Sequence, residues 1–247
     1  MIKFFRKIRQ NLLMENKTGK YFKYAIGEII LVVIGILIAL QINNWNERNK
    51  LNELKQGYYQ QLLEDLNKDK LYIKNQIIDF ESSRDEYNLY LETYKKPNLT
   101  TEESIDNLLS IEFISVTLSF QTNSIESLEN TGDIKLIPLI VRNSLIDLKK
   151  IKDKTVKIAF TNDEHKSNLL EKVLEMVGGP TLMDRLKNQK ELSEFLKPQE
   201  NYHNLFLLYE AAQAWRNQSE LTTLKALKTI QDKNDSVIEL IEGEIKK

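Results

Sequence analysis

The sequence predicts an all-α protein: an N-terminal transmembrane helix followed by an elongated helical bundle with long antiparallel helices. Three observations predict this class. Twelve consecutive apolar residues lie near the N-terminus and show no polar face. Further along the chain, apolar residues recur at steps of three, four and seven, the spacing of one helical face. Glycine (8) and proline (4) are scarce, and because turns favour these residues, their shortage indicates few corners.

The composition excludes some kinds of chemistry and some classes of binding partner. The chain has 247 residues, of which 41% are hydrophobic and 29% charged, as in a folded protein of one or two domains. It has no cysteine, so disulfides and thiolate chemistry are excluded. Residues 1–24 carry seven basic groups and one acid, whereas 28 basic residues face 34 acidic ones from Asn43 onward. The basic end suits anionic lipid, and the acidic remainder predicts no nucleic-acid partner.

Residues 1–24 are predicted to be a cytoplasmic, basic and amphipathic segment. Within residues 1–14, hydrophobic side chains share one broad helical face and polar ones share the other. Such a segment can lie along the inner leaflet. The alternative is a short charged tail that only sets the topology.

Residues 25–42 are predicted to be the transmembrane helix. Ile29–Leu40 is apolar throughout, and only Glu28 and Gln41 interrupt the 18 positions. At 1.5 Å per residue they span about 27 Å, close to a bilayer core of about 30 Å. A buried core helix would usually show a polar face. A cleaved signal peptide would have a shorter apolar region and a better cleavage site than Ala39-Leu40-Gln41.

Charge predicts the orientation of this span. Basic residues precede it in excess, and those that follow it are offset by acids. The positive-inside rule predicts a cytoplasmic N-terminus, so the span is expected to be a signal-anchor with the bulk of the chain on the other side of the membrane. In a Gram-negative cell that means an inner-membrane protein with its bulk in the periplasm. Candidate membrane-interface residues flank the span and are Tyr21, Tyr24, Trp45, Lys20 and Lys23.

Small residues on the span are candidates for helix packing. Gly27, Gly35 and Ala39 are spaced by eight and four and therefore share one face. Small residues allow close approach of a second helix, which predicts a homodimer through the transmembrane helix. The alternative is that glycine and alanine are common in spans in any case.

The sequence GKYFKYAIGEIILVVIGILIALQINNWNE (Gly19–Glu47) closely resembles the N-terminal signature of domain-of-unknown-function family 6090. A second stretch, SIESLENTGDIKLIPLIVRNSLIDL (Ser124–Leu148), resembles a later region of the family. The resemblance implies a single-span, helical inner-membrane protein of the kind found in flavobacteria and their relatives. It implies no activity, cofactor or catalytic residue.

Residues 43–96 are predicted to form a long membrane-proximal helix, either unbroken or as two nearly continuous helices. Asp69 and Arg84 interrupt its apolar face, which favours packing within a bundle over a free stalk. Residues 97–247 are predicted to be the remainder of the extracytoplasmic bundle.

Breaks divide that remainder into helices. Thr100 or Thr101 is predicted to cap a helix after Pro97. Apolar and polar residues alternate over residues 114–121, which is typical of a strand. A loop or a helical continuation is the alternative. Ser124 is predicted to cap a short helix that ends at Gly132, and Pro138 to open a helix as far as Val177, with Leu139 and Ile158 among its inner residues.

The break at Gly178–Pro180 is either a hinge or a terminator. A short helix over Thr181–Lys197 follows. Two C-terminal helices, Asn201–Gln218 and a second one capped by Ser219, are predicted to form an antiparallel hairpin.

No catalytic constellation is present in the sequence. His165 and His203 lack companions at metal-ligand spacing. There is no glycine-rich phosphate loop and no nucleophile elbow. The sequence therefore predicts neither an enzyme nor a bound cofactor or metal, but a membrane-anchored interaction or scaffold module that meets an unidentified protein partner. The alternatives are a ligand-sensing module that signals laterally through its span, and an enzyme with an unrecognised helical site.

Overall fold

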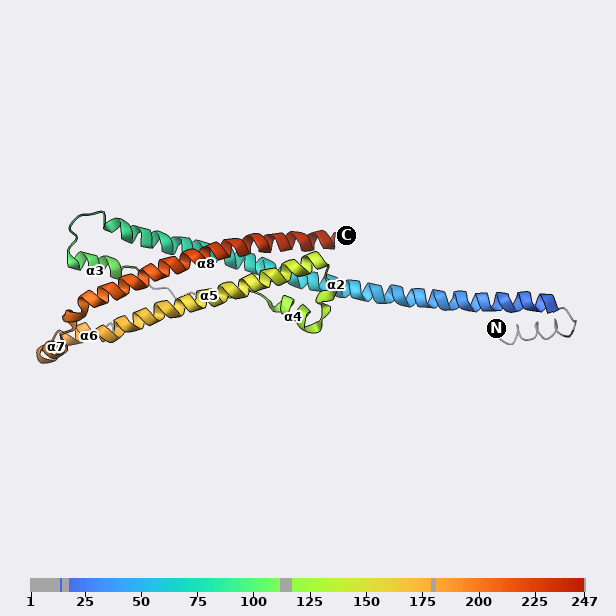
Figure 1. Cartoon of the computed structure of the whole chain (residues 1–247), viewed down its shortest axis with the longest axis horizontal. Coiled ribbons are helices and arrows are strands. Elements are labelled where there is room, and N and C mark those ends of the chain that lie inside the picture. The colour runs from blue at the N-terminus through green and yellow to red at the C-terminus, as the bar shows by residue number, and fades with distance from the viewer. Residues whose placement is uncertain (1–13, 15–17, 112–116, 179–180, 247) are drawn as a thin grey trace. The chain divides into compact units, whose positions relative to one another are not determined.

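The computed structural model describes residues 14, 18–111, 117–178 and 181–246, and within these ranges it contains helices and irregular segments but no strand (Figure 1). The amphipathic pattern predicted over residues 1–14 lies outside the described residues apart from Met14. The chain divides into two compact units, Met1–Gly57 and Tyr58–Lys247. The elements in order are α2 (Thr18–Thr93), α3 (Thr101–Leu109), α4 (Asn123–Thr131), the 3₁₀ turn η1 (Asp133–Leu136), α5 (Leu139–Val177), α6 (Leu182–Leu186), α7 (Lys190–Leu196), η2 (Pro198–Asn201) and α8 (Tyr202–Ile245). The predicted all-α class is confirmed.

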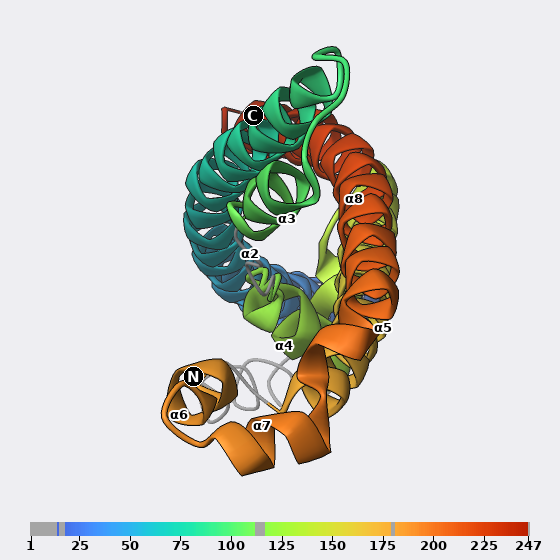
Figure 2. The ribbon, with the colours of Figure 1, turned by 90° about the vertical axis from the view of Figure 1, so that its left-hand side faces the viewer.

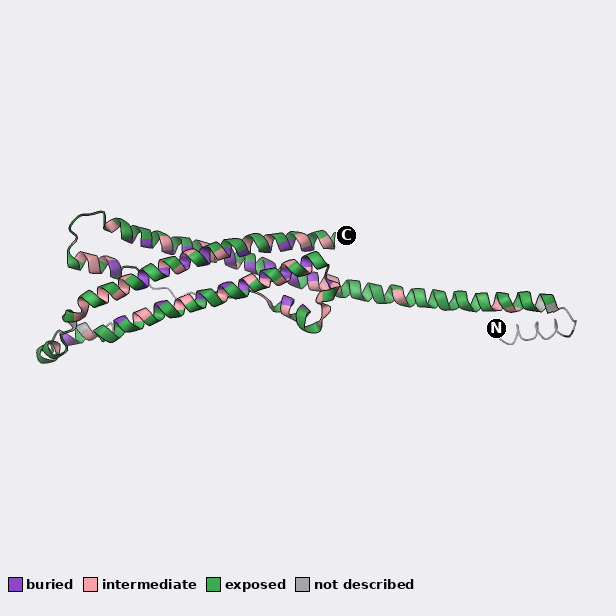
Figure 3. Ribbon diagram, in the orientation of Figure 1, coloured by how far each residue is buried: buried purple, intermediate pink, exposed green. Residues whose placement is uncertain are grey.

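The second unit is a bundle of three long helices. In it, α5 and α8 lie side by side and run in opposite directions, and the part of α2 from Tyr58 onward runs the same way as α5 (Figures 1 and 2). The short helices α3 and α4 pack at its side. Figure 3 shows the buried residues as a stripe along each long helix, facing the other two. One continuous apolar core runs along the bundle, and a smaller cluster lies at the α3 end around Tyr87, Tyr90 and Leu108.

The buried stripe follows a heptad spacing, alternately three and four residues apart. On α8 it runs without interruption through Gln213, Arg216, Glu220, Thr223, Leu227, Ile230, Asn234, Val237 and Ile241. On α2 it runs through Tyr59, Leu62, Leu66, Asp69, Ile73, Phe80, Ser83, Tyr87 and Tyr90, with half-buried Gln76 completing the spacing. A seam of this kind keeps one face of each helix turned toward its neighbours over many turns. Several of its positions hold polar residues, and these are the most unusual feature of the bundle.

Local sequence signals set most helix ends. The Thr100 side chain accepts from the Glu103 N–H and the Glu103 carboxylate accepts from the Thr100 N–H, so Thr100 is the predicted N-cap and forms a capping box with Glu103. Gly132 ends α4 with φ +76°, and Gly178 ends α5 with φ +72°. Both lie in the left-handed region that glycine adopts at low cost. The predicted helix end at Gly132 is therefore confirmed, α5 ends at Val177 as predicted, and Pro138 is the residue just before α5, as expected.

Four local predictions are wrong, among them the cap predicted at Ser124. The C-terminal hairpin does not form, because α8 is one helix from Tyr202 to Ile245 and its heptad seam passes through Ser219 without a break. Residues 181–197 form two short helices, α6 and α7, separated at Lys187–Gln189. Leu139 and Ile158, which were predicted to face inward on α5, are 61% and 37% exposed because they fall outside the seam.

For two further predictions, the structure shows which of the stated alternatives is correct. The long helix after Asn43 is continuous, since α2 extends from Thr18 to Thr93. Residues 117–121 are irregular, so the described part of the strand candidate is a loop. Ser124 lies just inside α4 and is buried, and its N–H and hydroxyl both donate to Asp65 on α2, at 3.2 and 2.6 Å. Ser124 therefore fastens α4 to α2 instead of capping α4.

Candidate functional site

The apolar part of α2 in the first unit is exposed along its whole length. Every residue from Ile29 to Leu40 is exposed, and none of the most hydrophobic window is buried (Figure 3). Typical values are 63% for Ile29, 57% for Leu37 and 54% for Leu40. The transfer of one side chain of this size from water to an apolar environment is favourable by roughly 1 kcal/mol or more of free energy. Among the described residues this is the one helix long and apolar enough to cross a membrane, so it is a candidate membrane-spanning helix.

The residues predicted to pack or anchor the span all lie on this helix. A Cβ atom added to Gly27 or Gly35 would meet nothing within 4 Å, so the predicted packing face is open. Ala39, Tyr24, Lys23 and Trp45 are exposed. The side chains of Lys20 and Tyr21 lie outside the described part. The structure therefore does not test the predicted packing and interface roles, which stay predictions.

In the second unit, a buried ion pair joins α2 to α5. Lys152 Nζ lies 2.5 Å from Asp69 Oδ2, and the side chains are 0% and 2% exposed. The other carboxylate oxygen of Asp69 accepts from the Gln121 N–H at 2.9 Å. The Lys152 ammonium also lies 5.8 Å from the centre of the Phe120 ring, within the range of a cation–π contact. Asp69 is therefore the central acceptor of a network that holds α5 and the loop before α4 against α2.

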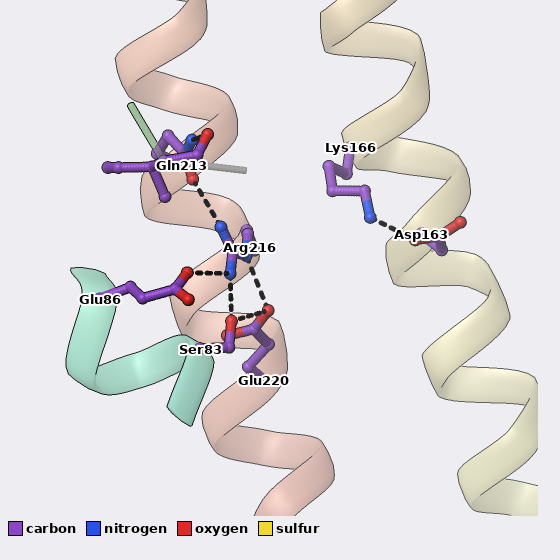
Figure 4. Close-up of polar contacts among 8 residues, drawn as sticks. Ser83, Glu86, Asp163, Lys166, Gln213, Arg216 and Glu220 are labelled. Carbon is purple, nitrogen blue, oxygen red and sulfur yellow. Dashed lines mark hydrogen bonds and ion pairs between the residues drawn. The ribbon is translucent and has the colours of Figure 1, made fainter. Parts of the chain in front are cut away.

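A larger buried polar cluster lies around Arg216 on α8 (Figure 4). Its Nε donates to Glu220 at 2.8 Å, and its guanidinium also donates to Gln213 and to the Ser83 hydroxyl on α2. Ser83 in turn donates to the Glu220 carboxylate at 2.8 and 2.9 Å. The Glu86 carboxylate lies 4.0 Å from the guanidinium. Each buried charge thus has an opposite charge and hydrogen bonds around it, as burial in a protein interior requires.

A small cavity lies beside this cluster, between α5 and α8. It has a volume of about 20 Å³, which is room for about one water molecule. Arg216 and Glu220 line it from α8, and Asp163 and Lys166 line it from α5. Lys166 Nζ lies 2.5 Å from Asp163 Oδ1, and the two side chains are 7% and 19% exposed. The cavity is too small for an organic ligand.

Two further titratable side chains, Tyr90 and His165, make contacts that join helices or rings. Tyr90 on α2 donates its hydroxyl to Glu210 on α8 and lies 3.0 Å from the Tyr94 hydroxyl. Burial, followed by these hydrogen bonds, raises the pKa of Tyr90. The His165 ring packs edge-on against Trp215, with ring centres 5.4 Å apart. No group of three or more potential metal-ligating side chains occurs among the described residues.

Sequence reasoning missed the polar clusters. Asp69 was recognised only as an interruption of an apolar face, and Arg216, Glu220 and Lys152 were not singled out. Their heptad position was the available signal, since each falls on the three-and-four spacing shared with buried leucines.

The comparisons with known proteins agree with the first sequence motif. The model of a family of unknown function (DUF6090) matches residues 28–123. The match confirms the resemblance carried by Gly19–Glu47, and it ends just before the second resembling stretch, Ser124–Leu148. No curated protein and no solved structure matches the chain.

Proposed function

We propose that this chain, related through its N-terminal part to a family of unknown function, is a membrane-anchored extracytoplasmic protein that acts as a non-enzymatic interaction or scaffold module. One observation carries the proposal. Ile29–Leu40 exposes an unbroken apolar surface on every side of α2. In water that surface would cost roughly 1 kcal/mol or more per aliphatic side chain, whereas in lipid it costs nothing.

Charge supports the proposed orientation. The excess of basic residues before the span favours a cytoplasmic N-terminus in the inner membrane, with the second unit in the periplasm. Tyr24 and Trp45, both exposed near the ends of the apolar stretch, suit the two membrane interfaces.

The pairing of the buried polar groups supports a structural role for these residues. Asp69 is paired with Lys152, and Arg216 with Glu220, inside the helical seam. Groups paired in this way hold helices together. The proposed partner is another protein, which the long helical surface of the second unit can contact.

Cysteine labelling tests the anchor and its orientation. The chain has no cysteine, and a Cβ added at Gly19 or at Gly243 meets nothing within 4 Å. Gly19→Cys and Gly243→Cys therefore form a matched pair on opposite sides of the span. In cells with a permeabilised outer membrane, a membrane-impermeant maleimide should label Gly243→Cys at once and Gly19→Cys only after lysis. The reverse pattern, or recovery of the protein without detergent, would contradict the proposal.

The alternative role is ligand sensing with a signal passed laterally through the span. The small residues Gly27 and Gly35 suit it, because they let a second spanning helix approach closely. Gly35→Leu should then abolish dimers trapped by crosslinking in membranes, whereas Ile36→Leu, on another face, should leave them intact. Equal crosslinking of both variants would exclude this face as the contact.

A further inference from the structure

The C-terminal half of α5, residues 160–177, has a different interior from the half that precedes it. The earlier half buries valine and leucine side chains at the seam spacing, namely Val141, Leu145 and Leu148. Beyond Ala159, the buried side chains among the described residues are those of Lys166 and Val173. Toward this end of the bundle α2 also diverges from α5 (Figures 1 and 2). About five turns of α5 therefore contribute one described apolar side chain to the interior.

The two apolar clusters of the second unit do not include this half of α5. The main core contains α5 residues as far as Ala159, and the smaller cluster joins α2, α3 and α8 around Tyr87 and Phe206. Neither cluster contains a described residue of α5 beyond Ala159. Other apolar side chains of this half face solvent, since Phe160 is 62% exposed and Leu174 is 48% exposed. Apolar burial is the main favourable term in helix packing, so the contact of this half with α8 is weak.

Polar residues occupy the interface between this half of α5 and α8. The small cavity between the two helices is lined from α5 by Asn162, Asp163 and Lys166. Asp163 and Lys166 lie on the same helix (Figure 4), so their ion pair is kept when α5 moves away from α8. Further along, the His165 ring packs against Trp215, which is 43% exposed. Water can solvate these polar and exposed groups, so separating the two helices here costs little.

We propose that residues 160–177 form a hinged arm, which separates from α8 as one unit while the rest of the bundle stays folded. Both ends of the arm suit this motion. Ala159 is the last α5 residue in the main core, and Gly178 follows the arm with a φ of +72°. The first half of α8 stays in place, because Phe206 and Tyr209 pack in the smaller cluster.

The motion gives the second unit a closed form and an open form. In the open form, the charged side chains that line the cavity become accessible from solvent, so the arm controls access to a polar surface inside the bundle. This surface includes Lys166 on the arm and Arg216 on α8, which are 6% and 4% exposed in the closed form. The arm belongs to the second unit alone, and its opening does not depend on the proposed membrane anchor or scaffold role.

Hydrogen–deuterium exchange of the purified full chain in detergent, resolved to single amides, tests the arm. The amides of residues 160–177 should share one level of protection, about a hundredfold below that of residues 141–155. Asn162 is a half-buried residue at a seam position. Asn162→Leu adds an apolar contact there and should raise the protection of residues 160–177 about tenfold, while residues 141–155 stay unchanged. Asn168→Leu is the matched control, because Asn168 is exposed on the same helix, and it should alter neither segment.

Three results would overturn the proposal. Equal protection in the two halves of α5 would show that the helix opens only when the whole bundle unfolds. Protection that falls steadily from Phe160 to Val177 would be fraying of a helix end and not the opening of a unit. Equal protection of residues 160–177 in Asn162→Leu and Asn168→Leu would show that packing at the seam does not limit the opening. Circular dichroism checks that both variants are folded, and the comparison within the parent chain needs neither of them.

Discussion

Replacing Lys152 with methionine should destabilise the second unit strongly. Lys152 and Asp69 are 2.5 Å apart, with side chains 0% and 2% exposed. Methionine is apolar and of similar length, so the change leaves a buried carboxylate with no cation and only the Gln121 N–H as donor. Removing one partner of a buried pair costs about 3–5 kcal/mol. At about 2–4 °C per kcal/mol for a domain of this size, thermal unfolding followed by circular dichroism in detergent should shift downward by about 6–20 °C.

Two further variants separate the missing cation from the lost packing. In the double variant Asp69→Asn/Lys152→Met no charge is buried, and the asparagine oxygen can still accept from Gln121. It should therefore recover about 2 kcal/mol of the loss. Lys150→Met is the control on the same helix, where the side chain is 73% exposed, and it should change stability by no more than about 0.5 kcal/mol. If Lys152→Met unfolds within about 1 °C of the parent chain, the pair does not stabilise the bundle as argued.

Two other predictions concern helix ends. Hydrogen bonds from Lys96 and then from Thr100 hold the pKa of Glu103 at about 2, below its ordinary 4.5. Because this pKa is lowered by folding, its stabilisation is complete above pH 4.5 and is lost as the pH falls toward 2. Glu103→Gln should remove that part of the acid dependence of the urea midpoint, and an unchanged acid limb would contradict the assignment. Gly132→Ala should lower the free energy of unfolding by about 1 kcal/mol, because Gly132 has a φ of +76°. Gly243→Ala, inside α8, is the control and should raise the free energy of unfolding by about 0.5 kcal/mol. Equal effects of the two substitutions in urea unfolding would show that Gly132 is not needed for its backbone conformation.

Short-range signals made the helical class and most helix ends predictable. The capping residue Thr100, the glycine at Gly132 and the break after Val177 act within one or two turns, so they are visible in a single sequence. The exposed apolar stretch was predictable for the same reason, since its length and composition alone distinguish it from the rest of the chain.

The polar interior was not predictable, because burial of a charged residue depends on another helix. Asp69 and Lys152 lie 83 positions apart, and nothing near either one identifies the other. The same reason explains the error in α8. Ser219 is a good capping residue by type, but the seam continues from Arg216 through Glu220 to Thr223. Packing against two other helices therefore overrides the local signal.

The buried polar layers also bear on how the bundle selects one alignment. A heptad seam of leucines and isoleucines can shift by seven residues and still bury apolar side chains. With such a shift of α2, Lys152 would face Leu62 or Gln76 in place of Asp69, and Glu220 would lose Ser83. Each alternative leaves a buried charge unpaired, at a cost of several kcal/mol. The ionic layers therefore penalise the wrong alignments, and the correct one holds Asp69 where it accepts from the Gln121 N–H in the loop before α4.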